Sequence, residues 1–180
     1  QEISVMLPIA AGTYEIDKSH SQLGFSVTHL DISIVKGTFD VFTGSLMVGD
    51  TISTTAVSID AEMASINTGN ASRDQHLQGD TFFDVANHPH MKFKSVSISE
   101  SGEEYELTGE LTVKGITDTV TLTGIYNGSA VFPPDGSTHH GFSMSGIISR
   151  GAFDVSYGES MVADEVKLTL EIQFIGQGSE

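Results

Sequence analysis

Apolar and polar residues alternate along most of this chain, and this period of two constrains the fold more than any other feature. In the segment 105–113, YELTGELTV, Leu107 and Leu111 fall on one side of an extended chain while Glu106 and Glu110 fall on the other. Residues 166–174, VKLTLEIQF, show the same pattern. Successive side chains of a strand point to opposite faces, so the sequence predicts strands that are buried on one face only.

Further alternating segments occur near residues 36–48, 53–62, 91–98, 118–126 and 140–149, separated by turn signals such as Asn-Gly and Pro-Pro-Asp-Gly. Only residues 70–88 break the pattern. In that connection we expect one or two short helices, with a side-chain cap near Asn70 and an end at Gly79. The chain is predicted to form a single domain over 1–180, with an N-terminal arm at 1–11 and a C-terminal tail at 176–180.

Antiparallel strands with one apolar face must bury that face, either between two sheets or inside a closed one. Several of the predicted strands are long, and glycines such as Gly109 and Gly146 interrupt them. Glycine permits the bends and close approaches of a coiled sheet. The pattern therefore favours an all-β, extended antiparallel eight-stranded barrel with room for one small ligand, and a filled β-sandwich is the alternative.

The composition excludes several classes of partner. With 24 acidic and 8 basic residues, the chain carries a formal charge of −16, which repels nucleic-acid phosphates and anionic lipid surfaces. No apolar run reaches the length of a transmembrane helix, so we expect no stable membrane insertion. The chain begins with Gln1 and a short apolar stretch, which fits an exported mature protein and fits a trimmed chain equally well.

The sequence contains no constellation that predicts catalysis. It has no cysteine, no G-x-S-x-G, no H-E-x-x-H and no phosphate-binding glycine loop between a strand and a helix. We therefore predict a protein that is not an enzyme, with no metal and no cofactor. Adventitious metal binding is left open for two histidine pairs, His88 with His90 and His139 with His140.

Two polar residues have both a structural and a functional interpretation. His29 shares a strand face with Phe25 and Val27, so it is either a hydrogen-bonded core histidine or a polar group in an apolar cavity. Arg73 either pairs with a neighbouring aspartate on the surface or places its guanidinium at a cavity mouth. Arg150 has the same two interpretations.

Five spaced motifs in order resemble the YceI-like family of bacterial polyisoprenoid-binding proteins. They are YEIDKSHSQLGFSVTH at 14–29, GTFDVFTGSL at 37–46, SINTGNASRDQHLQGDTFFDVANHPHMKFKS at 65–95, GELTVKGIT at 109–117 and VADEVKLTLEI at 162–172. The resemblance implies a lipocalin-like barrel around an apolar tunnel. It also implies non-covalent binding of a long isoprenoid or similar lipid, such as a polyprenyl phosphate or an isoprenoid quinone, in the periplasm or outside the cell.

On this basis the predicted binding residues form two groups. Those expected to line or close the tunnel are Phe25, Val27, Phe39, Val57, Phe82, Phe83, Phe93, Leu111, Val113, Leu122, Phe153 and Leu168. Those expected near its opening are His29, Arg73, Asp74, His76 and Arg150.

The role of the bound lipid stays open among carriage, storage and sensing, and homodimerisation is also left open. Two alternatives remain at this point. One is a β-sandwich interaction module without an internal ligand, and the other is an enzyme that modifies a bound lipid through His29 or Asp74.

Overall fold

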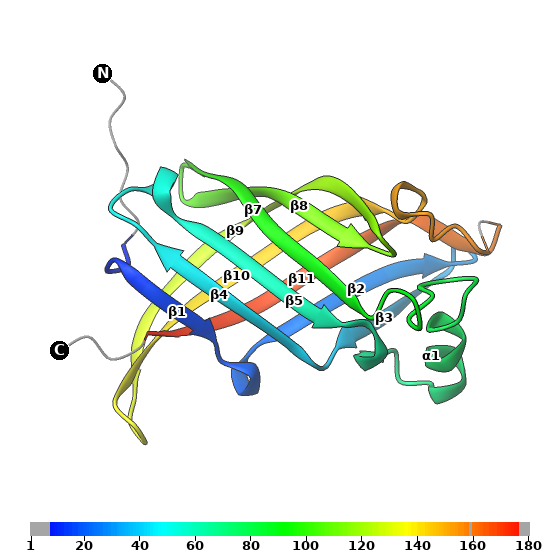
Figure 1. Ribbon diagram of the computed structural model, residues 1–180, viewed down its shortest axis with the longest axis horizontal. Helices are drawn as coiled ribbons and strands as arrows, with labels where there is room; N and C mark the ends of the chain where they lie inside the picture. Colours follow the sequence, from blue (N-terminus) through cyan, green and yellow to red (C-terminus); the bar gives the residue numbers. More distant parts are fainter. Residues whose placement is uncertain (1–7, 159, 177–180) are drawn as a thin grey trace.

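The computed structural model describes residues 8–158 and 160–176, which form one antiparallel sheet that closes on itself (Figure 1). Eight strands make the ring, in the order β1-β4-β5-β7-β8-β9-β10-β11 and back to β1, while β2, β3 and β6 continue the sheet beyond β11. The strands are β1 (Gly12–Ile16), β2 (Gln22–His29), β3 (Ser33–Phe39), β4 (Phe42–Val48), β5 (Ala56–Glu62), β6 (Ile66–Asn67), β7 (His90–Ser101), β8 (Glu104–Val113), β9 (Ile116–Phe132), β10 (Ser137–Ser149) and β11 (Val162–Gly176). The predicted lipocalin-like barrel is thus confirmed.

The long strand β11 closes the barrel because it pairs with two strands in succession. Its last residues pair with β1, with Tyr14 opposite Gly176, and its middle pairs with β2, with Val27 opposite Val166. A 3-10 turn at Lys18–His20 joins β1 to β2, and Asp17 caps this turn by accepting a hydrogen bond from the Ser19 amide. The β2–β3 hairpin therefore extends the wall beyond the closed ring.

The sheet opens along part of β3. Only Thr38 and Phe39 of this strand pair with β6, so residues 33–37 bond to β2 alone. A short helix and the loop after it lie at this end of the barrel (Figure 1). Where the sequence shows one alternating segment at 36–48, the chain makes two strands, β3 and β4, interrupted at residues 40–41.

The connection at 70–88 contains a single α-helix, α1 (Ala71–Leu77). The Asn70 side chain accepts a hydrogen bond from the Arg73 amide and so caps its N-terminus, as expected. After the helix the chain folds back tightly, because the amides of Phe82 and Asp84 both donate to the Gly79 carbonyl. Residues 85–87 form turns rather than a second helix. No helix in the described part of the chain is long and apolar enough to cross a membrane.

The interior near the paired ends of β1 and β11 is filled with side chains. The His140 ring is 7% exposed, stands edge-on to Tyr14 at a centroid distance of 5.2 Å, and shares a hydrogen bond of 2.8 Å with the Tyr126 hydroxyl. Phe142 and Phe174 pack edge to face beside it. Other buried apolar residues of this half are Ile16, Leu46, Val48, Leu107, Met144 and Ile172.

Burial, with a smaller contribution from neighbouring His139, lowers the pKa of His140 below its ordinary value of 6.5. The unfolded chain therefore binds a proton at higher pH than the native one, so this histidine makes stability fall as pH drops below about 6.5. We expect the His140→Gln variant, which keeps a hydrogen-bonding group for Tyr126, to lose part of this pH dependence. Urea unfolding of both proteins at several pH values between 7.5 and 5, a range that spans the ordinary histidine pKa of about 6.5, gives the free energy of unfolding at each pH. If this free energy changes equally with pH in both proteins, His140 is not the source of the pH dependence.

Candidate functional site

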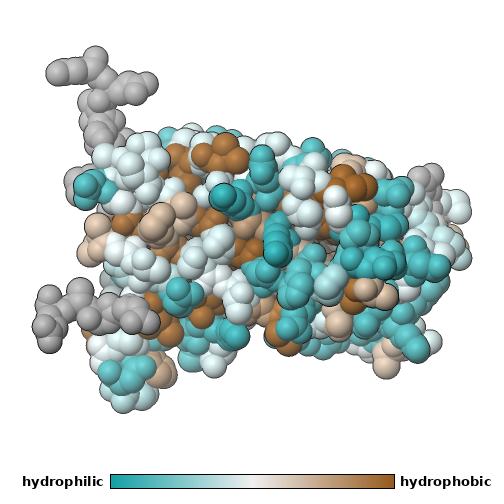
Figure 2. Space-filling view, in the orientation of Figure 1, coloured by the Kyte–Doolittle hydropathy of each residue, from teal (hydrophilic) through white to brown (hydrophobic). Residues whose placement is uncertain are grey.

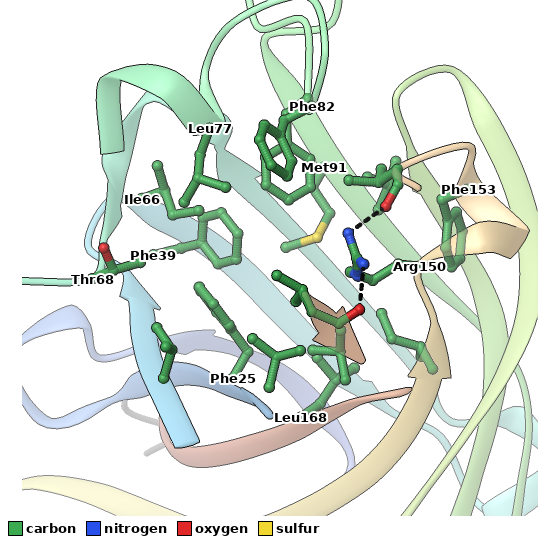
Figure 3. Close-up of a pocket in the computed structure, with 18 of the residues that line it drawn as sticks. Phe25, Phe39, Ile66, Thr68, Leu77, Phe82, Met91, Arg150, Phe153 and Leu168 are labelled. Atoms are coloured by element: carbon green, nitrogen blue, oxygen red, sulfur yellow. Dashed lines mark hydrogen bonds between the residues drawn. The ribbon is translucent and has the colours of Figure 1, made fainter. Parts of the chain in front are cut away.

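The other half of the barrel interior encloses a cavity of about 410 Å³, lined mainly by apolar side chains. In Figure 3, Phe39, Ile66 and Leu77 lie on one side of it, with Phe25 and Leu168 across from them. These five residues come from β3, β6, α1, β2 and β11, respectively. The volume is within the range of about 300–1,000 Å³ that is usual for small-molecule pockets. The filled β-sandwich is therefore wrong, because the ring closes and part of its interior is hollow.

Most of the sequence-predicted site residues line this cavity. Those that do so are Phe25, Val27, His29, Phe39, Arg73, His76, Phe82, Phe83, Phe93, Leu111, Val113, Leu122, Arg150, Phe153 and Leu168. Asp74 and Val57 are not part of the lining. Val57 is buried away from the cavity, on the same strand as the lining residue Ile59. Contact with a ligand stays a prediction for all of them.

The cavity opens between α1 and the loop that precedes β11. Of the lining residues, only Arg73, His76, Tyr157 and Met161 are exposed to solvent. Figure 1 places α1, the β2–β3 hairpin and the 150–161 segment at the same end of the barrel. The mouth therefore faces away from the end where β1 and β11 pair.

Thr68 organises the polar side of the mouth. Arg73 donates from Nε to the Thr68 hydroxyl at 2.7 Å and from Nη2 to the Thr68 carbonyl at 2.6 Å. Asp74 accepts from the Thr68 amide at 3.0 Å and also from the Thr68 hydroxyl. Within the described residues Arg73 forms no ion pair with an aspartate, and its Nη1 makes no hydrogen bond. Asp74 thus fixes the loop, while one nitrogen of Arg73 is left for another acceptor.

His29 reaches the cavity from β2, where its backbone pairs with Ser33 and Val162. It is half-buried rather than part of the core. Its ring nitrogens make no hydrogen bond with the part of the chain that the structure describes. Of the two interpretations, the geometry therefore favours a polar group in an apolar cavity over a hydrogen-bonded core histidine.

Three rings bridge the mouth. His76 stands edge-on to Phe82 at 5.0 Å and to Tyr157 at 5.6 Å, and Phe82 contacts Tyr157 at 5.1 Å, all between ring centroids. Edge-to-face pairs at such distances are favourable, so they hold the helix side of the mouth against the opposite loop. Tyr157 has no motif around it that predicts this role.

Arg150 holds the opposite loop by its backbone. The guanidinium lies at the cavity wall (Figure 3) and donates to the carbonyls of Val155 at 2.8 Å, Tyr157 at 3.1 Å, Val162 at 3.0 Å and Ala163 at 3.0 Å. Four carbonyl acceptors occupy most of the five donors of the guanidinium. Arg150 therefore shapes the mouth, and its role is mainly to hold the backbone at residues 155–157 and 162–163.

Asp164 stabilises the turn from which Arg150 projects. Its carboxylate accepts from the Ser149 hydroxyl at 2.6 Å and from the Gly151 amide at 2.8 Å. These two hydrogen bonds, with a smaller contribution from the Arg150 charge, lower the pKa of Asp164 below its usual value. Nothing in the alternating pattern of β11 distinguishes Asp164 from the other outward acids.

In each of the two histidine pairs, at least one histidine is hydrogen-bonded to a residue outside the pair. His90 bonds Asp60 at 2.7 Å and His139 bonds Gln173 at 2.8 Å. Among residues 8–158 and 160–176, no group of three or more histidine and acidic side chains is placed to hold a metal ion.

A closed antiparallel barrel with an internal apolar cavity defines a lipocalin-like fold. The YceI-like domain family matches residues 14–174, and the chain belongs to this family. A UPF0312 protein of Staphylococcus aureus (strain USA300) is 34% identical over 165 residues, covering 89% of this chain and 92% of that protein.

Solved structures agree with the fold. The crystal structure of a Campylobacter jejuni YceI protein has a TM-score of 0.74 at 30% identity, covering 84% of this chain and 90% of the other. Burkholderia cenocepacia BcnA has a TM-score of 0.78 at 24% identity, covering 88% and 98%. A domain of Saccharophagus degradans described as polyisoprenoid-binding has a TM-score of 0.64 at 14% identity, covering 91% and 98%. The first of these neighbours supports the family assignment, and the other two support the fold alone.

Replacing Arg150 tests whether it orders the loop at the mouth. Arg150→Met leaves several carbonyls without donors, so we expect the free energy of unfolding to fall by on the order of 2–3 kcal/mol. Hydrogen exchange of residues 155–157 and 162–163 should accelerate in the same variant. The matched change Arg73→Met removes bonds at an exposed position and should cost less than about 1 kcal/mol. Equal decreases in the free energy of unfolding in the two variants would contradict this role for Arg150.

Proposed function

We propose that the cavity binds a long-chain isoprenoid or a similar amphiphilic lipid without covalent attachment. The observation that carries the proposal is the distribution of polarity. The cavity wall is mainly apolar, and groups that can hydrogen-bond a ligand, such as Arg73 and His76, lie at its mouth. The ligand class is taken from the description of a Saccharophagus degradans domain of the same fold as polyisoprenoid-binding.

The hydrocarbon tail supplies most of the affinity. Each methylene that leaves water for the cavity contributes about 0.8 kcal/mol. The side chains of Phe25, Phe39 and Leu168 surround the space that the tail would occupy. Because Met144 and Ile16 are buried and do not line the cavity, the tail in this proposal ends within the part of the barrel near α1 and does not run through a tunnel along the whole barrel. The cavity therefore limits how much of a long chain is enclosed.

The head group lies at the mouth in this proposal. The Arg73 Nη1 and the ring nitrogens of His29 can donate hydrogen bonds there, and His76 lies beside them at the opening. A polyprenyl phosphate and an isoprenoid quinone both carry acceptor oxygens that such donors recognise.

The protein acts in this proposal as a non-catalytic carrier, store or sensor in the periplasm or outside the cell. Asp74, one of the two residues considered for catalysis, directs its carboxylate to Thr68 and does not line the cavity. His29 has no acidic or hydroxyl partner among the described residues that would prepare it as a general base. The arrangement of Asp74 and His29 therefore fits a binding role and provides no general base.

Filling part of the cavity should weaken lipid binding. Leu168→Trp places a larger side chain in the lining, and we expect it to reduce the affinity for a fluorescent prenyl lipid by about tenfold or more. Ile147→Trp changes a residue of the neighbouring strand that is 65% exposed and outside the lining, so it is the matched control. Fluorescence titration gives both affinities. Equal binding by the two variants would show that the ligand is not in the cavity.

Removing the donors at the mouth should affect head-group recognition only. We expect His29→Ala and Arg73→Gln each to weaken binding of a prenyl phosphate by about fivefold to tenfold, because each loses one hydrogen bond to a charged group. Binding of the corresponding prenyl hydrocarbon should stay unchanged. Competition against the same fluorescent lipid measures both ligands. A parallel loss for phosphate and hydrocarbon would contradict the placement of the head group.

A further inference from the structure

The turn between β2 and β3 exposes an unusual set of large apolar side chains. Leu30 is 50% exposed, Ile32 is 83% exposed and Ile34 is 64% exposed. These three residues are called the apolar tip below. Isolated exposed apolar residues are ordinary, but three in a single tight hairpin form a local apolar projection.

The backbone of this turn is also strained. Leu30 and Asp31 have φ values of 52° and 59°, in the left-handed region that favours glycine and asparagine. These φ values fit a type I′ hairpin turn, which the Ile32 amide closes by donating to the His29 carbonyl at 3.2 Å. Leucine is a costly residue in this conformation, and half of its surface stays exposed. The hairpin accounts for the turn conformation, but folding does not account for leucine and isoleucine as the exposed side chains of the turn.

The apolar tip adjoins the mouth of the cavity. The Leu30 amide donates to the Met161 carbonyl at 2.6 Å, which joins the tip to the loop before β11. Met161 and Tyr157, each 48% exposed, belong to the cavity lining, as does His29 at the base of the tip. Exposed apolar groups therefore border the opening on both of these segments, at the end of the barrel that carries α1 (Figure 1).

The hairpin that carries the apolar tip is neutral along its own sequence, although β11 brings Asp164 and Glu165 opposite Thr28. Between residues 26 and 39, Asp31 and Lys36 balance each other, whereas the chain as a whole carries −16. Lys36 follows Ile34 by two positions, so the two side chains share the outer face of β3. A lysine stem can lie along apolar surface while its ammonium reaches polar head groups. Hydrophilic residues cover much of the face shown in Figure 2 near α1.

We propose that the apolar tip docks transiently on the surface of a lipid bilayer and that the ligand enters the cavity there. This inference rests on the proposed function, because it supplies a path from bilayer to cavity that avoids water. Leu30 and Ile32 enter the interface, Lys36 meets the head groups, and the mouth bordered by Met161 faces the membrane. The acidic remainder is repelled by an anionic surface, which orients the barrel with the tip first.

A bilayer explains the features of the tip better than a protein partner. The apolar side chains project from a hairpin turn, whereas a sheet partner would use the unpaired edge of β3 at residues 33–37. Pairing through that edge would not require a strained leucine beside the cavity mouth. Association of two copies through this edge is therefore the competing outcome that the experiment must distinguish.

The test measures vesicle binding and lipid transfer for single variants. Ile32→Asp and Ile34→Asp place a charge at the tip, and we expect each to weaken binding to phosphatidylcholine vesicles by about tenfold or more in sedimentation. The rate at which each variant takes up a fluorescent prenyl lipid from these vesicles should fall by a similar factor. The affinity of each variant for the same lipid in detergent should change by less than about twofold, because neither side chain lines the cavity.

The matched controls are Val96→Asp and Val131→Asp, at residues that are 66% and 62% exposed on other parts of the barrel. Both should bind vesicles like the unmodified protein. With phosphatidylglycerol in the vesicles, binding should weaken at low salt and recover as salt screens the repulsion.

Three results would overturn the proposal. The first is that the unmodified protein does not sediment with vesicles. The second is that the tip variants bind vesicles as well as the controls do. The third is that light scattering shows a dimer, which Ile32→Asp converts to a monomer. Binding to ligand-free vesicles tests the tip independently of the cavity. A protein that docks but takes up no lipid would instead refute the proposed function.

Discussion

Closure of the sheet by β11 is the interaction on which the rest of the structure depends. Its register with β1 brings Tyr14 opposite Gly176, while its earlier residues pair with β2. A ring of strands leaves no long free edge in this part of the sheet and turns one face of every strand inward. Because the side chains filling the interior are concentrated near the β1 end, closure encloses both a packed half and a hollow half.

The two arginines of the chain organise the loops at the cavity mouth. Arg150 donates to four carbonyls, and Arg73 donates twice to Thr68, so both sides of the cavity mouth are fixed by guanidinium groups. A loop whose carbonyls would otherwise be unsatisfied near an apolar cavity needs such donors. The mouth is therefore preorganised, and the ring contacts of Tyr157 complete it.

Much of the wall could be predicted from sequence because alternation determines which side chains face inward. Leu111, Leu122 and Leu168 follow from the period of two, and the ordered motifs identify the barrel that they line. The break between β3 and β4 was missed because residues 40–41 do not interrupt the composition of the segment 36–48.

The long-range contacts could not be predicted in this way. Tyr157 meets His76 only after the chain has closed, and Asp74 turns toward Thr68 rather than the cavity because of the local loop geometry. No periodicity tells which half of a barrel is filled, since that depends on the combined side-chain volumes of strands far apart in sequence. The hollow half is thus a property of the assembled sheet.

The most direct measurement is native mass spectrometry of the protein purified by mild extraction. The account predicts a one-to-one complex whose added mass is that of a long-chain lipid, released on denaturation. A protein that is ligand-free and takes up no prenyl lipid on incubation would contradict it.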